Sequence, residues 1–245
     1  MLRIVKELYG YSIRTINGDI GEVHDFYFDD RFWTIRYLVV DTSKWLPGRK
    51  VLIPPVALGE PDWKKRVFPV SLTRDQVKSS PDFDTNKPLS RQHEENLHIY
   101  YSWPFYWDYE AVASVGPMMS AHAERKKIAA ERGGEDLHLR STREVIDYRI
   151  HAIDDEVGHV QDFVVEDESW IIRYMVVDTR KWLPGKKVLV FRECIERISW
   201  ADSEVYVDLS REEIKNSPEF DPRQPVNREY EERLYDFYGH PKYWI

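Results

Sequence analysis

The residues that could carry chemistry are four polar positions that occur twice, 137 positions apart. They are Asp25 and Asp162, Arg36 and Arg173, Asp41 and Asp178, and Lys44 and Lys181. An aspartate in such a set could act as a general base. A structural role is the stronger interpretation, because two copies of one fold need the same turns, whereas an enzyme usually needs one good site. We expect Asp25 to pair with Arg36 on a neighbouring strand, and Asp41 to cap a turn.

Motifs for cofactors and metals are missing from the sequence. It contains no glycine-rich phosphate loop, no His-Glu-x-x-His and no Cys-x-x-Cys pair. The eight histidines are scattered; His24 aligns with Gln161, and His159 aligns with Glu22. Cys194, the single cysteine, excludes an intramolecular disulfide and is interpreted as a small buried residue, with a reactive thiol as the alternative. We therefore expect no catalytic residue, no cofactor and no metal site.

The polar positions are held by a stretch that predicts strand, connection and strand. Residues 35–40 are rich in Ile, Val and Tyr, as expected for a buried strand, and Pro47-Gly48 supplies a turn before the return strand at 50–53. The second copy spans 172–189. The structural motif comprises Asp41, Trp45, Pro47 and Gly48, and in the second copy Asp178, Trp182, Pro184 and Gly185. If the rings of Trp45 and Trp182 are fully buried, their replacement by alanine should cost about 3–5 kcal/mol each.

The 137-residue offset continues without a gap from Gly21 to Trp107. Such a long period with two copies indicates duplicated globular domains. We expect a first repeat with its C-terminal extension over 1–110, a linker over 111–135, and a second repeat with its extension over 136–245. A break in alternation at Gly21 predicts a bulge. Thr73 to Gln76 and Ser210 to Glu213 each match a helix capping box.

These features resemble the PRC-barrel family, and the order of elements in both copies carries the resemblance. It covers roughly residues 1–80 and 138–215, through Gly21-Glu22-Val23-His24-Asp25-Phe26 and the Trp45-Leu46-Pro47-Gly48 connection. The family includes the cytoplasmic domain of the photosynthetic reaction-centre H subunit and the C-terminal domain of a ribosome maturation factor. The resemblance implies a mainly β chain with short helices, forming two small antiparallel β-barrels in tandem. The family shares no catalytic residues, so none is transferred.

Each repeat is followed by an extension that is charged early and aromatic late. Residues 88–101 and 225–238 predict helices that end in aromatic clusters. Such clusters either cap the parent barrel or lie at an interface between halves or chains. The candidate interaction surface comprises Tyr101, Trp103 and Trp107, and in the second copy Tyr238, Tyr243 and Trp244. We expect segments 98–107 and 235–244 to pack between the halves or between chains.

Composition limits the kinds of partner. The net charge is −8, and residues 136–245 hold 24 acidic against 16 basic residues. An acidic surface repels phosphate backbones, so nucleic-acid binding is disfavoured. No apolar run approaches the roughly 18–20 residues that span a membrane, although peripheral association stays open. The sequence predicts a cytoplasmic location, with a homo-oligomer as an open alternative.

The leading functional hypothesis is a non-catalytic module for protein binding or assembly. It rests on the aromatic extensions and on the small-barrel resemblance. One alternative is an accessory protein of a photosynthetic reaction centre, by analogy with the H subunit. Another is an enzyme with a pocket between the two halves. An RNA-processing role is disfavoured by charge.

Overall fold

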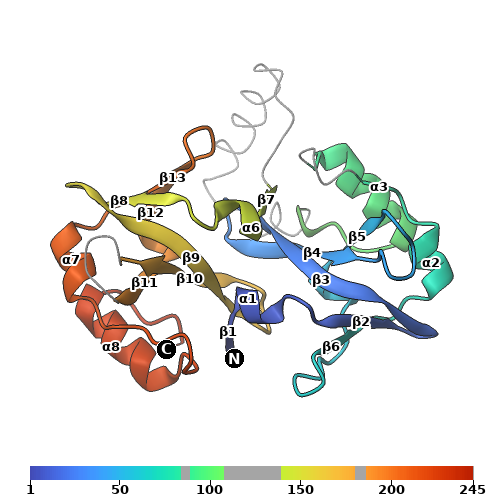
Figure 1. Ribbon diagram of the computed structural model, residues 1–245, viewed down its shortest axis with the longest axis horizontal. Helices are drawn as coiled ribbons and strands as arrows, with labels where there is room; N and C mark the ends of the chain where they lie inside the picture. The colour runs from blue at the N-terminus through green and yellow to red at the C-terminus, as the bar shows by residue number, and fades with distance from the viewer. Residues whose placement is uncertain (84–88, 108–138, 180–185, 245) are drawn as a thin grey trace. The chain divides into compact units, whose positions relative to one another are not determined.

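The computed structural model describes residues 1–83, 89–107, 139–179 and 186–244. The chain is mainly β with a few short helices, arranged as two sheets (Figure 1). It divides into two compact units. Unit 1 comprises 1–10, 25–36 and 141–245, and unit 2 comprises 11–24 and 37–140. The predicted division into 1–110 and 136–245 follows the 137-residue offset, whereas unit 1 contains residues from both of these ranges. The predicted linker over 111–135 lies outside the described residues.

The first sheet contains six strands in the order β5-β4-β3-β2-β6, with β7 paired to β3. Its strands are β2 (Ser12–Thr15), β3 (Gly18–Asp29), β4 (Thr34–Asp41), β5 (Lys50–Ile53), β6 (Val67–Pro69) and β7 (Leu139–Ser141). β2 and β6 run parallel, whereas β2 pairs with β3 and β4 pairs with β5 in antiparallel fashion. The expectation of a purely antiparallel arrangement is therefore corrected at β6.

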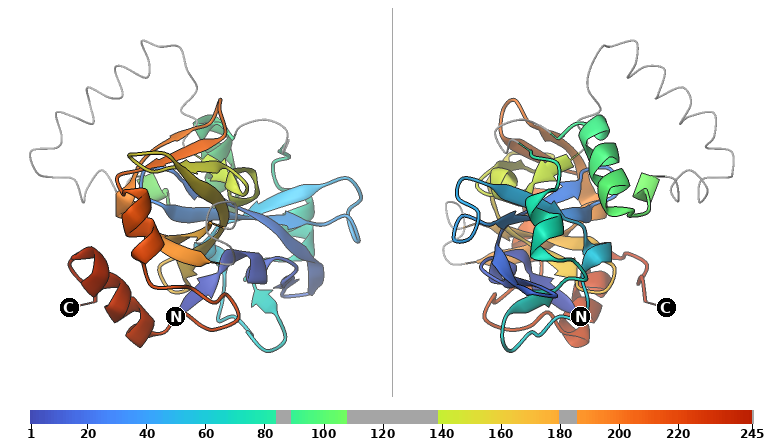
Figure 2. Two further views of the ribbon diagram at one scale, coloured as in Figure 1. Left: turned by 60° about the vertical axis from the view of Figure 1, so that its left-hand side comes forward. Right: turned by 90° about the vertical axis from the view of Figure 1, so that its right-hand side faces the viewer.

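The second sheet contains seven strands in the order β11-β10-β9-β8-β13-β12, with β1 paired to β9. Its strands are β1 (Leu2–Ile4), β8 (Arg149–His151), β9 (Glu156–Glu166), β10 (Ile172–Asp178), β11 (Lys187–Phe191), β12 (Ile195–Ser199) and β13 (Glu204–Val207). Again one neighbouring pair, β8 and β13, is parallel. The long strands β3 and β9 are twisted ribbons (Figures 1 and 2).

Both sheets are open, so the expected closed barrels are wrong for the part of the chain described. The first sheet ends at β5 and β6, and the second ends at β11 and β12. The core lies on the strands that the apolar runs predicted. Fully buried side chains include Phe26, Phe28, Tyr37, Phe163 and Tyr174. The pairing register of the central hairpin recurs at the 137-residue offset: Val39 faces Leu52, and Val176 faces Leu189.

A bulge bends β3 at the glycine that the sequence singled out. Gly21 has φ +154°, and a Cβ placed there would lie 2.0 Å from the carbonyl oxygen of Asp41. Gly158 in β9 has φ +149°, with the carbonyl oxygen of Asp178 at 2.2 Å. The β2–β3 register shifts beside Gly21, which confirms the predicted bulge. Only glycine permits the backbone to approach this closely.

The helices are short, and two of them begin at the predicted caps. α2 (Arg74–Lys78) and α7 (Arg211–Asn216) each start with a complete capping box, from Thr73 and Ser210 respectively. The extension helices are α3 (Arg91–Tyr101) and α8 (Arg228–Tyr238), and α8 leads towards the C-terminus in Figure 2. Two further single-turn helices, α1 (Val5–Leu8) and α6 (Thr142–Val145), follow β1 and β7 directly.

Candidate functional site

Asp25 is a buried capping residue rather than an exposed base. Its carboxylate accepts hydrogen bonds from Ser141 Oγ at 2.5 Å, Thr142 Oγ1 at 2.9 Å and the backbone amide of Arg143 at 3.3 Å. These donors lie at the N-cap and the first two residues of α6. A carboxylate at the start of a helix satisfies amide groups that have no partner within the helix. Asp25 therefore fixes the position of α6 within unit 1.

Asp162 makes the equivalent contact to α1. Its Oδ1 accepts the backbone amide of Lys6 at 3.2 Å, and Lys6 is the counterpart of Arg143 at the 137-residue offset. Ile4 and Val5 stand where Ser141 and Thr142 stand in the other copy. Burial, without hydroxyl donors from those two positions, raises the pKa of Asp162 to about 6. The two aspartates thus share one role in different surroundings.

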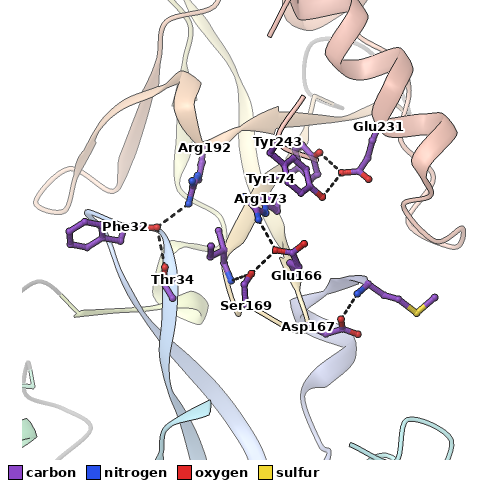
Figure 3. A network of polar contacts seen from close by, with 12 residues as sticks. Phe32, Thr34, Glu166, Asp167, Ser169, Arg173, Tyr174, Arg192, Glu231 and Tyr243 are labelled. Atoms are coloured by element: carbon purple, nitrogen blue, oxygen red, sulfur yellow. Dashed lines mark hydrogen bonds and ion pairs between the residues drawn. The ribbon is translucent and has the colours of Figure 1, made fainter. Parts of the chain in front are cut away.

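The predicted pairing of Asp25 with Arg36 is wrong. Arg36 instead faces Asp29, with Arg36 Nη2 and Asp29 Oδ2 3.8 Å apart. The β3–β4 turn follows directly after Asp29, so Arg36 lies near that end of β3. Asp25 lies four residues further back, which is roughly 13 Å along a strand. In the second copy Arg173 forms the equivalent ion pair with Glu166 at 2.6 Å (Figure 3).

Asp41 caps its turn as predicted. Asp41 Oδ1 accepts the amide of Ser43 at 2.8 Å, and that backbone hydrogen bond lowers the pKa of Asp41. Lys44 forms an exposed ion pair with Glu22. In the second copy Asp178 is fully buried. Lys181, Trp182, Pro184 and Gly185 lie outside the described residues.

Trp45 is half-buried, so the condition of full burial is not met. The guanidinium of Arg74 on α2 lies over its ring, 4.6 Å from the centroid. Pro47 and Gly48 are exposed at the turn, where Gly48 has φ +76°. The connection thus has a structural contact, through a cation–π pair at the surface. A smaller stability cost follows for Trp45→Ala than full burial would give.

A buried polar network attaches α3 to β4. Glu94, which is fully buried, accepts hydrogen bonds from Tyr37 at 3.2 Å and from Tyr106 at 2.6 Å, and Arg91 lies 3.3 Å from its other oxygen. His98 Nε2 lies 2.7 Å from the same Tyr37 hydroxyl, and its Nδ1 lies 2.8 Å from the carbonyl oxygen of Pro104. Burial lowers the pKa of His98.

The same network recurs between α8 and β10. Glu231 Oε1 accepts hydrogen bonds from Tyr174 at 2.7 Å and from Tyr243 at 3.0 Å, and Arg228 lies 3.1 Å from Oε2. Figure 3 shows both hydroxyls directed at this carboxylate. Tyr235 stands where His98 stands in the first copy. Sequence analysis missed these networks, although the Tyr, Glu and Arg positions all recur at the 137-residue offset.

The predicted aromatic surface is half-buried in both copies. Tyr101 stacks on Trp103 at 4.1 Å, and the guanidinium of Arg91 lies 4.3 Å from the centroid of the Trp107 ring. In the second copy the rings contact β10, β11 or α8: Tyr238 packs on Phe191, Tyr243 lies under Arg173, and Trp244 lies under Arg228. These contacts agree with the cap over the parent sheet that the sequence left as an alternative. The interface role of these residues stays a prediction.

Two aliphatic side chains are strongly exposed at equivalent hairpin turns. Ile16 is 72% exposed and Ile153 is 71% exposed. Their backbones are fixed, because Ile16 N donates to Leu72 O at 2.9 Å and Ile153 N donates to Leu209 O at 3.0 Å. A signal was present in the sequence, since each isoleucine precedes a pair of turn-forming residues, Asn17-Gly18 or Asp154-Asp155, where a side chain is difficult to bury.

The described part of the chain also includes candidate metal-ligand side chains and the thiol of Cys194. There, no group of three His, Cys, Asp or Glu side chains could hold a metal ion. Cys194 is buried, as predicted, and burial raises the pKa of its thiol to about 12. A thiol with so high a pKa is a poor nucleophile. None of the described helices is both long and apolar enough to cross a lipid bilayer.

Comparison with known proteins gives the family of the N-terminal part. An uncharacterized protein of Deinococcus radiodurans is 36% identical over 84 residues, which make up 34% of this chain and 30% of that protein. The chain thus covers less than a third of that relative. A family model, the PRC-barrel domain, matches residues 4–76. This match covers β2 to β6, the Trp45 connection and the first three residues of α2. Residues 4–76 of this chain are a PRC-barrel domain.

Proposed function

We propose that this protein is a non-catalytic module for protein binding or assembly, with one aliphatic anchor in each sequence repeat. The observation that supports the proposal most directly is the exposure of Ile16 and Ile153 at equivalent turns. Single exposed apolar residues are common on protein surfaces. The same aliphatic residue, held outward by the same backbone hydrogen bond in both copies, favours a shared contact.

A second exposed apolar residue contacts α2, the helix that also contacts the turn of the first anchor. Tyr100 is 40% exposed and donates from its hydroxyl to Gln76 O on α2 at 2.9 Å. Ile16 is adjacent to Asn17, whose side-chain oxygen accepts the backbone amide of Arg74 at the start of α2. The first patch therefore consists of Ile16 and Tyr100 near α2. Phe237 is the counterpart of Tyr100 and is also 40% exposed.

The two patches differ in charge. Ile153 is followed by Asp154 and by Asp155, which is paired with Arg211 at 2.7 Å, and the adjacent helix α7 carries Glu212 and Glu213 in its first turn. Asn17 and Gly18 occupy the corresponding turn positions beside Ile16. Complementary charge contributes to the choice of partner. We therefore propose that Ile153 contacts a more basic protein surface than Ile16 does.

A photo-crosslinking experiment in the native cell tests this function. A photoreactive amino acid replaces Ile16 or Ile153, and Lys65 or Asp202 in matched controls. The two control positions are exposed and are themselves equivalent at the 137-residue offset. We expect a discrete protein adduct from the isoleucine positions and none from the controls. The identity of that adduct decides between a general adaptor and a reaction-centre accessory protein.

Glutamate variants complete the test. Because both side chains are exposed, Ile16→Glu and Ile153→Glu should change unfolding free energy by no more than about 0.5 kcal/mol. Each should nevertheless abolish the adduct formed at a neighbouring position in its own patch. If adducts form equally at Lys65 and Asp202, or persist in the glutamate variants, these patches are not the binding sites.

A further inference from the structure

In unit 1, residues of the first repeat contact residues of the second repeat through reciprocal pairs of equivalent positions. Two backbone hydrogen bonds define the centre of these contacts: Ile35 N donates to Trp170 O at 2.8 Å, and Ile172 N donates to Trp33 O at 2.7 Å. The second bond is the first with the roles of the repeats exchanged. Between them Thr34 pairs with Ile171, its own counterpart at the 137-residue offset. An approximate two-fold axis therefore passes through this pair.

The side chains around the axis follow the same reciprocity. Trp33 lies 6.3 Å from Phe163, and Trp170 lies 6.1 Å from Phe26, measured between ring centroids. Both tryptophans are nearly buried and have positive φ, 53° and 58°. Further from the axis, Asp25 caps α6 and Asp162 caps α1. We call this set of reciprocal contacts the pairing surface.

A surface that matches its own copy across a two-fold axis is the kind that subunits of a symmetric dimer use. We propose that the pairing surface also recognises a second copy of this chain, so that two chains can exchange halves through the contacts now made within one chain. This interaction goes beyond the proposed function, because it uses buried residues of unit 1 and not the exposed isoleucines.

Exchange between unlike halves would require no new contact. When the first half of one chain meets the second half of another, every bond of the pairing surface is re-formed. When like halves meet, Asp25 pairs with a second Ile4-Val5 segment, and Asp162 pairs with a second Ser141-Thr142 segment. Over two chains, the number of aspartates that meet hydroxyl donors and the number that meet Ile4-Val5 therefore stay the same. Exchange is opposed mainly by the effective concentration of halves joined in one chain, which is typically millimolar.

Cysteine variants of the full chain test the proposal. Thr34 and Ile171 form a pair in which the flanking residues carry the hydrogen bonds, and such pairs place the Cα atoms about 4.5 Å apart. This spacing suits a disulfide. Thr34→Cys and Ile171→Cys are prepared as separate chains in a Cys194→Ala background. They are mixed, refolded together at millimolar concentration, and oxidised. Neither variant can form this disulfide within one chain.

We expect covalent dimers, with a disulfide joining positions 34 and 171 of different chains. The control pair is Lys65→Cys with Asp202→Cys, which are exposed and equivalent but lie outside the pairing surface. The yield of covalent dimer from Thr34→Cys with Ile171→Cys should exceed the yield from the control pair by about tenfold or more. This holds at chain concentrations near the effective concentration of two halves joined in one chain. Equal yields from the two pairs, or no dimer from either, would show that the surface does not recognise a second copy.

Discussion

Thr142 Oγ1 donates a hydrogen bond of 2.9 Å to the buried carboxylate of Asp25, across 117 residues of sequence. The counterpart of Thr142 is Val5, so the counterpart of Asp25, Asp162, receives no such bond from that position. Asp25 therefore has hydroxyl donors, whereas burial raises the pKa of Asp162. This difference makes the two positions matched controls for each other.

Asp162→Asn should stabilise the protein at neutral pH, whereas Asp25→Asn should destabilise it. Burial raises the pKa of Asp162 from 3.8 to about 6, so the native state binds that proton more tightly than the unfolded state. The contribution of this group is fully present below pH 3.8 and is lost as the pH rises through 6. By linkage the loss above pH 6 is about 2–3 kcal/mol at most.

Urea unfolding between pH 4.5 and 8 measures both effects. The Asp162→Asn profile should decline less than wild type as the pH rises through 6, because asparagine keeps an oxygen for the Lys6 amide. Asp25→Asn should lose about 1–3 kcal/mol, since Ser141, Thr142 and the Arg143 amide then share one acceptor oxygen. A larger loss at pH 8 for Asp162→Asn than for Asp25→Asn would contradict the assignment.

Gly21→Ala and Gly158→Ala should be severely destabilising. The added Cβ would lie 2.0 Å or 2.2 Å from a backbone carbonyl oxygen, where no flexible side chain can move aside. We expect a loss of more than about 3 kcal/mol in unfolding free energy for each variant. Gly10→Ala is the control: it has φ +76° and open space around it, so it should cost only about 1–2 kcal/mol. Similar losses at Gly10 and Gly21 would contradict the close approach of the strands.

Acid should loosen α3 before α8. Burial lowers the pKa of His98, so its contribution to stability is present above its ordinary pKa of 6.5 and is lost as the pH falls below that value. A protonated Nε2 can no longer accept from the Tyr37 hydroxyl, which then has Glu94 as its acceptor. The charge of Arg91 adds repulsion, and Glu94 offsets part of it. Tyr235 holds the same position under α8 and does not titrate in this range. His93 on the same helix also has its pKa lowered by burial. Hydrogen exchange at pH 7.5 and 5.5, corrected for intrinsic rates, should show protection lost in α3 alone; equal loss in both helices would contradict this role of the two histidines.

Trp45→Ala should lower the free energy of unfolding by about 1–2 kcal/mol. This loss is smaller than that for a fully buried tryptophan, because the Trp45 ring is half-buried and its specific partner is Arg74. Arg74→Ala should remove part of the same energy, so the double variant should lose less than the sum of the single losses. Denaturant unfolding of the three variants measures this coupling. Strict additivity would show that Arg74 and Trp45 act independently.

Local structure was largely predictable from sequence, because it depends on residues close together in the chain. The capping boxes at Thr73 and Ser210, the turn at Asp41 and the bulge at Gly21 were all expected. Pairing partners were harder to predict. Arg36 could be given the wrong aspartate, because alternation shows which face a residue occupies but not how far along the next strand it lies.

No local signal in the sequence predicted which sheet the first strand of the chain joins. β1 pairs with β9 of the other repeat, and the three residues Leu2–Ile4 would suit an edge position on either sheet. The choice depends on contacts such as Asp162 with Lys6, which become evident only in three dimensions. The buried polar networks of α3 and α8 did carry a signal, since Glu94 and Glu231 are related by the 137-residue offset. Charged residues on a helix are usually solvated, however, so this signal did not indicate burial.

The central claim is that residues from both halves of the sequence meet in unit 1 around Thr34 and Ile171. Its most direct test is a full chain that carries Thr34→Cys and Ile171→Cys together, with Cys194→Ala, oxidised at micromolar concentration, where chains stay separate. Peptide mapping by mass spectrometry should find a disulfide between positions 34 and 171 within a single chain, at near-complete yield. Free thiols at both positions in the folded, oxidised protein would contradict the account.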